Sequence, residues 1–113
     1  MVNFDKVEFC SDAESFMDSL EEKTRNKVYY NIRKAQQVTD DKLFKKLDDE
    51  IWEFRTLHNK KQIRLFAFRY REGGTETIVI TTHGIVKKTS KVPIKEIKKA
   101  MEIRRDYLNS KMK

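Results

Sequence analysis

Residues 51–57 (IWEFRTL), 61–71 (KQIRLFAFRYR) and 75–83 (TETIVITTH) decide the fold, because their apolar side chains recur at every second position. A period of two is typical of β-strands, in which successive side chains point to opposite faces of the sheet. The middle segment is apolar on both faces, which predicts a central strand. Residues 72–75 (EGGT) form a turn signal, so we expect the last two segments to pair as a hairpin.

The segment before this meander predicts one strand and two helices. Residues 2–9 (VNFDKVEF) alternate loosely between apolar and polar, which favours a first strand. Ser11 and Glu14 have the spacing of a capping box. Helical spacing then follows at four apolar residues: Ala13, Phe16, Met17 and Leu20. A second helix is predicted from Thr24, with three residues facing inward: Val28, Ile32 and Ala35.

Two further segments complete the predicted fold. The stretch VTDDKLFKKLDDE (38–50) breaks the helical pattern, and we expect a short helical turn around Leu43, Phe44 and Leu47. Pro93 is predicted to be the first residue of a last helix. Four residues of that helix are expected to face the body of the protein: Ile94, Ile97, Met101 and Leu108. The order predicts one α+β domain over residues 1–113, with helices packed on an antiparallel sheet.

Composition excludes several classes of protein. The 113 residues include three Gly and one Pro, which rules out collagen-like chains, Rossmann fingerprints and P-loops. Cys10 is the single cysteine, and the two histidines lack metal-binding spacing, so we expect neither a disulfide nor a metal. No apolar run approaches the ~20 residues of a membrane span. The first twenty residues lack a signal-peptide core, so a cytoplasmic protein is expected.

Charge is distributed unevenly along the chain. Residues 1–50 hold nine basic and twelve acidic side chains, whereas residues 51–113 hold sixteen basic and six acidic ones. The net charge of +7 therefore arises in the second half. A basic surface of this kind favours a polyanionic partner, although a solvated lysine-rich face would have the same composition.

Three groups of residues in the basic half can carry chemistry. They are Arg55 with His58, Lys60 and Lys61; Arg64 with Arg69 and Arg71; and the run His83 to Thr89 (HGIVKKT), where a strand is expected to enter a tight basic loop. Arg and Lys bind phosphate, and an imidazole exchanges protons near neutral pH. If the strands are neighbours, these groups converge and supply what metal-free RNA cleavage needs: a base, an acid and cations for the phosphorane.

Plainer interpretations stand beside each of these. Arg55 can pair with Glu53 or Glu50, and His58 can be an ordinary loop residue. His83 can simply shape a turn, and the neighbouring lysines can be solvated charges.

The segment from Leu47 to Ala100 resembles the phage Gp49-like/HigB branch of the RelE/ParE toxin superfamily. Its members typically show a Trp-Glu-hydrophobic-Arg strand, matched by IWEFR (51–55), and an Arg followed by aromatic residues, matched by IRLFAFRY (63–70). They also show a His-Gly-aromatic-x-Lys-Lys-Thr loop before a Pro-led helix, which HGIVKKTSKVPIKEIKKA (83–100) matches, with Ile85 at the usual aromatic position. Residues 1–46 fit by element order alone.

The resemblance implies a RelE-like microbial RNase fold. It also implies a HigB-like toxin of a type II toxin–antitoxin pair, an endoribonuclease that cleaves mRNA on the ribosome without metal or cofactor and so inhibits translation. Its partners would be a helix-turn-helix antitoxin of the HigA kind, the ribosome and mRNA. Operator DNA would be reached only through the antitoxin.

Residue roles follow by position. In our hypothesis His83 is the general base or acid, and Arg55 and Arg64 stabilise the phosphorane. Lys87 and Lys88 hold flanking phosphates. Lys60 and Lys61 lie in a variable loop and rank lower. The opposite assignment, in which the lysines carry the chemistry and His83 shapes the turn, stays open.

Two other classes of function also remain open. A ParE-like toxin would inhibit DNA gyrase through protein contacts and would need no nuclease site. A plain RNA-binding module would only grip phosphates. The titratable residue beside the basic segment favours the nuclease.

Overall fold

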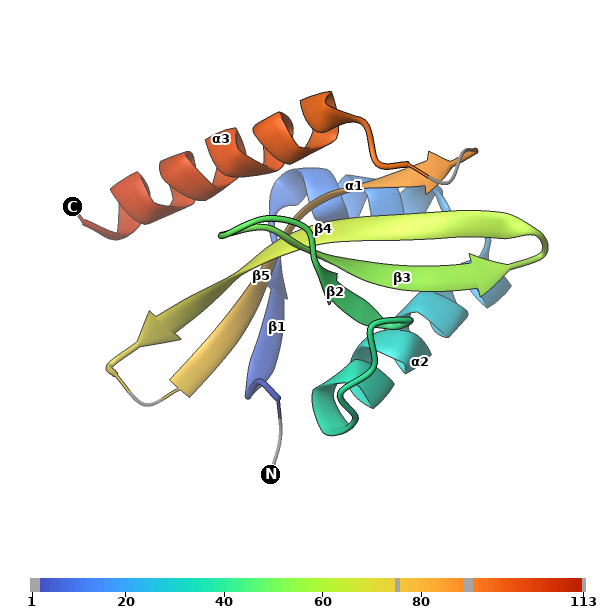
Figure 1. The fold of residues 1–113 in the computed structure, drawn as a ribbon, viewed down its shortest axis with the longest axis horizontal. Coiled ribbons are helices and arrows are strands. Elements are labelled where there is room, and N and C mark those ends of the chain that lie inside the picture. Colours follow the sequence, from blue (N-terminus) through green and yellow to red (C-terminus); the bar gives the residue numbers. More distant parts are fainter. Residues whose placement is uncertain (1–2, 75, 89–90, 113) are drawn as a thin grey trace.

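A mostly antiparallel sheet with helices on both faces forms the part of the protein that the structure, a computed structural model, describes: residues 3–74, 76–88 and 91–112. In chain order the elements are β1 (Lys6–Phe9), α1 (Ser11–Ser19), α2 (Glu22–Gln37), β2 (Phe44–Lys46), β3 (Trp52–His58), β4 (Lys61–Glu72), β5 (Glu76–Lys87) and α3 (Ile94–Lys111). The predicted α+β class, with two N-terminal helices and a C-terminal helix, is confirmed (Figure 1).

The strand order in the sheet is β1-β5-β4-β3-β2. Strands β2 to β5 form an antiparallel meander, so the predicted central place of β4 is confirmed. The first strand differs from prediction, because β1 pairs with β5 in parallel and the sheet is therefore mixed. The chain returns from β1 through α1 and α2 and adds β2 at the far edge of the sheet.

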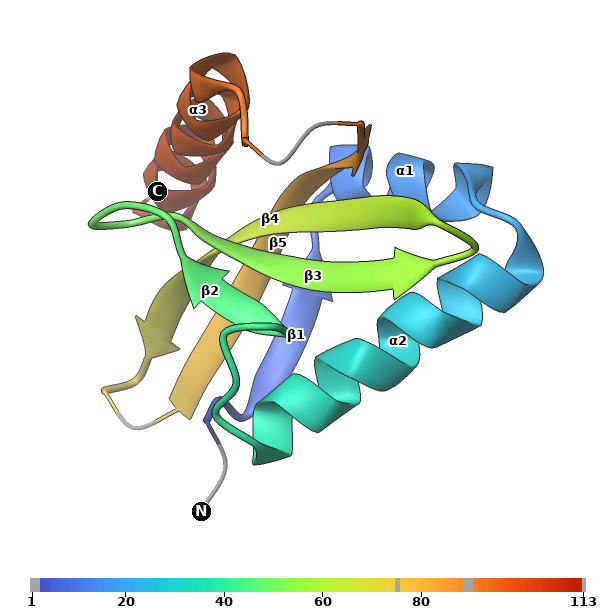
Figure 2. The same cartoon turned by 45° about the vertical axis from the view of Figure 1, so that its right-hand side comes forward.

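Strand β4 carries core side chains on both faces, as predicted. Ile63 and Leu65 pack in one hydrophobic core with Met17 of α1 and Val28 of α2. Phe66 and its neighbours on the opposite face pack in a second core against α3. Figures 1 and 2 show α2 and α3 on opposite sides of the sheet. Successive side chains of β4 point to opposite faces of the sheet, so this one strand contributes to both hydrophobic cores.

Strand β5 is longer than predicted and changes the setting of the basic segment. The hairpin turn before it uses Gly73 and Gly74, both at positive φ, as the turn signal indicated, while Thr75 lies outside the described residues. The strand then continues through His83 to Lys87, so the tight loop expected after His83 is wrong over residues 84–87, and Thr89 lies outside the described residues. Thr82 forms a bulge, because Phe66 pairs with His83 and Ala67 with Thr81.

Other local predictions need correction near the N-terminal half. The first strand begins at Lys6, and Val2 lies outside the described residues. Cys10 occupies the N-cap of α1 and Ser11 is already helical, so the capping box is wrong. The second helix begins at Glu22, two residues earlier than predicted.

The predicted helical turn around Leu43, Phe44 and Leu47 is wrong from Phe44 onward, because Phe44–Lys46 form strand β2, while Leu43 lies in the turn before it. Phe44 begins β2 and pairs with Phe54 of β3. Its ring stacks on Phe54 and Trp52, with centroids 4.4 and 4.7 Å away. Aromatic stacking across the strand pair therefore holds this short edge strand in the sheet.

The last helix docks through its middle. Pro93 is the N-cap of α3 rather than its first helical residue. Ala100 is fully buried, and Ile97 and Met101 pack beside it, as predicted for the last two. Ile94 is 70% exposed, so its predicted inward position is wrong. No helix within residues 3–74, 76–88 and 91–112 is both long and apolar enough to cross a membrane.

Candidate functional site

The face of the sheet that α3 contacts extends beyond the helix and carries a cluster of cationic side chains there. The cross-strand register puts Arg55 of β3 directly opposite Arg64 of β4. In the next row Leu57 and Lys87 flank Gln62. Leu57 is 67% exposed, which shows that α3 does not cover this end. Like charges directly opposite one another in a sheet cost stability, so the arginine pair indicates a functional constraint.

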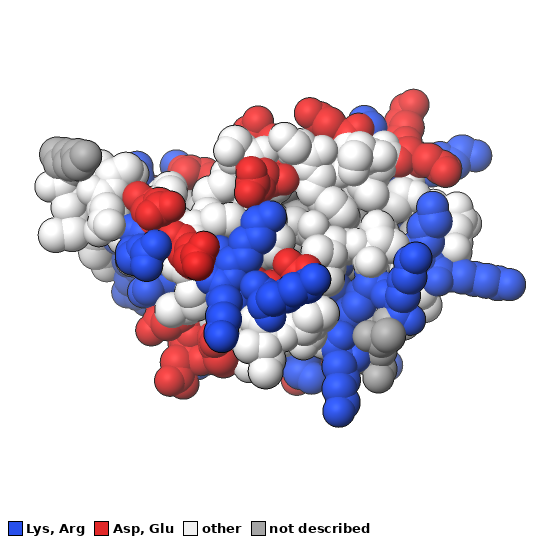
Figure 3. Space-filling model, turned by 90° about the horizontal axis from the view of Figure 1, so that it is seen from above, with Lys and Arg blue, Asp and Glu red and all other residues white. Residues whose placement is uncertain are grey.

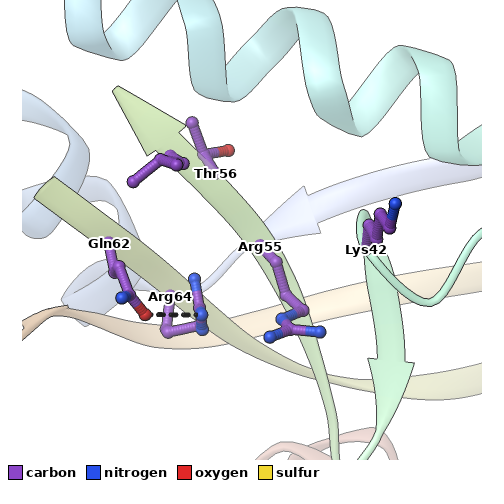
Figure 4. Close-up of a pocket in the computed structure, with 6 residues that line it drawn as sticks. Lys42, Arg55, Thr56, Gln62 and Arg64 are labelled. Carbon is purple, nitrogen blue, oxygen red and sulfur yellow. Dashed lines mark hydrogen bonds between the residues drawn. The ribbon is translucent and has the colours of Figure 1, made fainter. Parts of the chain in front are cut away.

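A pocket of about 260 Å³ opens between the two arginines. Its lining comes from β3, β4 and the segment before β2: Lys42, Arg55, Thr56, Leu57, Gln62 and Arg64. Figure 4 shows Arg55 and Arg64 side by side on neighbouring strands, with Lys42 on the far side of Arg55. A guanidinium can only donate, so Gln62 presents Oε1 to Nη2 of Arg64, at 3.0 Å. The pocket therefore has cationic walls and suits an anionic ligand.

The carboxylate of Glu53 lies between the two arginines. Oε1 of Glu53 is 3.4 Å from Nε of Arg64, and Oε2 is 3.6 Å from Nε of Arg55. The side chain of Glu53 is 3% exposed and that of Arg64 is 5% exposed, whereas Arg55 reaches solvent at 29%. The plainer interpretation in which Arg55 pairs with Glu53 is thus present in the structure, and the same carboxylate also ion-pairs with Arg64.

Lys87 is the third cation of the cluster and is buried, with 7% of the residue exposed. Burial lowers the pKa of its ammonium group, and the nearby guanidinium of Arg64 lowers that pKa further. Glu53 acts on the Lys87 pKa in the opposite direction. A lysine with a lowered pKa exchanges protons closer to neutral pH than an ordinary lysine does.

His83 lies on the same face but beneath α3, away from the pocket. It is 2% exposed, and its ring stacks on Phe66 with centroids 4.8 Å apart. Its Nε2 is 3.2 Å from Oε1 of Glu96 on α3, and its Nδ1 is 3.0 Å from Oγ1 of Thr82. Burial lowers the pKa of the imidazole, and the hydrogen bond to Glu96 opposes that shift. The expectation that His83 adjoins a tight basic loop is therefore wrong, because His83 lies within β5 and α3 covers it.

Comparison with protein families agrees with this fold. Residues 15–105 match the model of the family described as phage derived protein Gp49-like (DUF891). The chain belongs to the Gp49-like family. This is the Gp49/HigB toxin family, whose members are related to HigB-type toxins and in general have an antitoxin partner. No curated protein matches the chain.

The other predicted residues of this Gp49-like protein lie outside the cluster. Lys60 and Lys61 are exposed at the β3–β4 hairpin, and Lys88 is exposed just after β5. His58 ends β3 and is hydrogen-bonded through Nδ1 to Oγ1 of Thr24 on α2, at 3.0 Å, which agrees with a structural role.

The predicted group of Arg64, Arg69 and Arg71 does not stay together in the structure. Arg69 lies over the ring of Trp52, 5.3 Å from its centroid, and so is separated from Arg64. Arg71 lies further along the same strand, near the β4–β5 turn. Arg64 is thus the member of that group that joins the cationic cluster.

Sequence reasoning missed Glu53 as a site residue and did not consider Gln62 or Lys42. Glu53 precedes Arg55 by two residues, so the period of a strand places both on one face. The same rule aligns Gln62 with Arg64. For Lys42 no comparable signal exists, because it lies in a turn.

Charge on the surrounding surface follows the cluster. Seen from the α3 side, Lys and Arg side chains gather at the lower right of Figure 3, at the end of the molecule that carries the β3–β4 hairpin in Figure 1. Within the described residues no group of three or more His, Cys, Asp or Glu side chains is placed to hold a metal ion.

Proposed function

We propose that this Gp49-like protein is the toxin of a type II toxin–antitoxin pair and cleaves mRNA on the ribosome without a metal ion. The observation that carries the proposal is the cluster of Arg55, Arg64 and Lys87 on neighbouring strands, beside an open pocket. Charged groups of this kind can bind a phosphate and stabilise the charge of its transition state. The family's relation to HigB-type toxins supports RNA as the substrate.

Arg55 and Arg64 bind the phosphate at the bond to be cleaved. Guanidinium groups bind phosphate oxygens with two hydrogen bonds, and both groups line the same pocket. The 2′-hydroxyl attacks the adjacent phosphorus, forms the O2′–P bond and releases its proton to solvent. Negative charge grows on the phosphorane oxygens, where the two guanidinium groups stabilise it.

Lys87 gives a proton to the departing 5′-oxygen as the P–O5′ bond breaks. The products are a 2′,3′-cyclic phosphate and a 5′-hydroxyl. Burial and the neighbouring arginine make the Lys87 ammonium a better acid than an exposed lysine, because both lower its pKa. His83 has a structural role in this proposal, because its Nε2 contacts Glu96 and α3 covers it.

Exposed lysines hold the flanking phosphates. Lys88, Lys60 and Lys61 surround the cluster without entering it. A helix-turn-helix antitoxin would neutralise the toxin by covering this basic face.

The test compares two substitutions of Lys87 in single-turnover cleavage of mRNA on saturating ribosomes. Lys87→Met removes the charge, and Lys87→Arg keeps the charge but cannot give up a proton near neutral pH. We expect both to slow cleavage by on the order of 10²–10⁴-fold, with wild-type ribosome binding in Lys87→Arg. The matched control is Lys88→Met, an exposed neighbour, which should weaken binding and leave the rate at saturation near wild type. A Lys87→Arg variant that cleaves at the wild-type rate would assign Lys87 to phosphate binding alone.

A further inference from the structure

We infer that Glu53 is a positioning residue. Its carboxylate supplies the negative charge between Arg55 and Arg64 when no phosphate is bound, and it holds the two guanidinium groups in place. The inference rests on the proposed function for what the site binds. It concerns a residue that contacts the two arginines and acts on the reaction through them.

The first observation is the burial of the three charges. Glu53 and Arg64 are 3% and 5% exposed, and Lys87 is buried beside them. Buried cations are costly unless an opposite charge lies near. Glu53 is the carboxylate that ion-pairs with both arginines, so it permits the cations to be held together before RNA arrives.

The second observation is which nitrogen atoms Glu53 uses. It faces Nε of each arginine, while Nη1 of each has another partner. Nη1 of Arg64 donates to the carbonyl of Ile63 at 3.1 Å, and Nη1 of Arg55 donates to the carbonyl of Asp41 at 3.1 Å. Each guanidinium is therefore anchored on two sides, which fixes its orientation toward the pocket.

The third observation is that the ion pairs are long. At 3.4 and 3.6 Å they lie beyond ordinary charge-assisted hydrogen bonds. Within the described part of the chain, Oε1 of Glu53 and Nε of both arginines have no hydrogen-bond partner. Glu53 offsets one of the three positive charges of Arg55, Arg64 and Lys87, and both Nε donors lack a hydrogen-bonded acceptor, which favours an anionic ligand with several acceptor oxygens.

Opposite effects on binding and rate follow from this arrangement. Removing the carboxylate removes a negative charge that repels an incoming phosphate, so anion binding should tighten. It also releases the arginines from their fixed orientation, so cleavage should slow. A residue that merely held the fold together would weaken both.

The experiment measures both quantities in Glu53→Gln. We expect inorganic phosphate, titrated against the melting temperature of the free protein, to bind about threefold tighter than in wild type. Single-turnover cleavage at saturating ribosome should be at least about tenfold slower. The matched control is Glu50→Gln, which removes an exposed carboxylate 3.2 Å from Arg104, outside the site, and should leave both values unchanged.

A pH profile adds a third readout. Because Glu53 raises the pKa of Lys87, the alkaline limb of the rate profile should move to lower pH in Glu53→Gln. Should Glu53→Gln fail to fold, Glu53→Asp keeps the charge but is one methylene too short to reach both arginines. It should slow cleavage and keep wild-type phosphate affinity.

Weaker phosphate binding in Glu53→Gln, or wild-type cleavage in either variant, would overturn the inference. If the wild-type protein cleaves no mRNA, the proposed function fails by itself. The phosphate titration then still shows whether the carboxylate of Glu53 offsets the positive charge of an anion-binding site.

Discussion

The imidazole of His83 lies between the ring of Phe66 and the first turn of α3. A neutral imidazole forms hydrogen bonds to both Glu96 and Thr82 if its Nε2 donates to Glu96 and its Nδ1 accepts from the hydroxyl of Thr82. A protonated imidazole donates at both nitrogens, and Thr82 then turns its hydroxyl to the carbonyl of Phe66, 3.3 Å away. The ring thus holds α3 on the sheet in either state.

His83 should make stability depend on pH. Its pKa in the folded protein lies below the ordinary 6.5, so below about pH 6.5 the unfolded chain binds a proton that the folded protein does not. The free energy of unfolding should therefore fall as pH drops through 6.5, by at most about 1.4 kcal/mol per pH unit. Urea unfolding at about pH 7.5, 6.5 and 5.5 checks this, and His83→Gln should flatten the slope. An identical slope in His83→Gln and wild type would contradict it.

At the scale of elements, α1 is seated on β5 through Gly84. A β-carbon at this position would overlap the ring of Phe16. The backbone of Gly84 needs no left-handed conformation, so the glycine is required by the close approach of the helix. The glycine beside His83 therefore serves packing, where the sequence indicated a turn.

Substitution at Gly84 should separate α1 from the sheet. We expect Gly84→Ala to lower the free energy of unfolding by about 1–3 kcal/mol, because the new methyl group displaces the Phe16 ring. Denaturant unfolding of Gly84→Ala, Phe16→Ala and the double variant measures the coupling. The double variant should be more stable than the sum of the two single losses predicts, by about 0.5–3 kcal/mol. Simple additivity would show that the two residues do not meet.

Element prediction succeeded where periodicity extends over many residues. Strand β4 is twelve residues long and has apolar side chains on both faces, so its central position in the sheet could be predicted from the sequence. Strand β2 has three residues, too few to show a period, and the spacing of Leu43, Phe44 and Leu47 imitates a helical turn. The parallel pairing of β1 with β5 joins residues over seventy positions apart, and no local pattern encodes it.

At the scale of the whole molecule, charge is divided between an acidic first half of the chain and a basic second half. The acidic excess of residues 1–50 includes the exposed Asp12, Glu14 and Asp18 of α1. The basic excess includes the site cluster and the exposed lysines around it. A charge distribution of this kind steers a polyanion toward one face. The sequence showed this segregation and the placement of Arg55 near Arg64.

The burial of Lys87 was beyond sequence reasoning for a physical reason. It depends on β5 continuing past His83, and that continuation is stabilised by pairing with β4. The same holds for His83, which α3 covers through Glu96, thirteen residues away along the chain. Their residue types identified Lys87 and His83 as candidates from the sequence, but tertiary packing determines how exposed they are and in which direction their pKa values shift.

The chemistry of the RNA ends tests the proposed nuclease most directly. Programmed ribosomes are incubated with the purified protein, and the mRNA fragments are labelled with polynucleotide kinase without prior phosphatase treatment. Attack by the 2′-hydroxyl leaves the 5′-oxygen without phosphate, so we expect the downstream fragments to accept label directly and the upstream fragments to end in a 2′,3′-cyclic phosphate. Arg64→Gln should give no such fragments. Downstream fragments carrying a 5′-phosphate, or intact mRNA with inhibited DNA gyrase, would contradict the account.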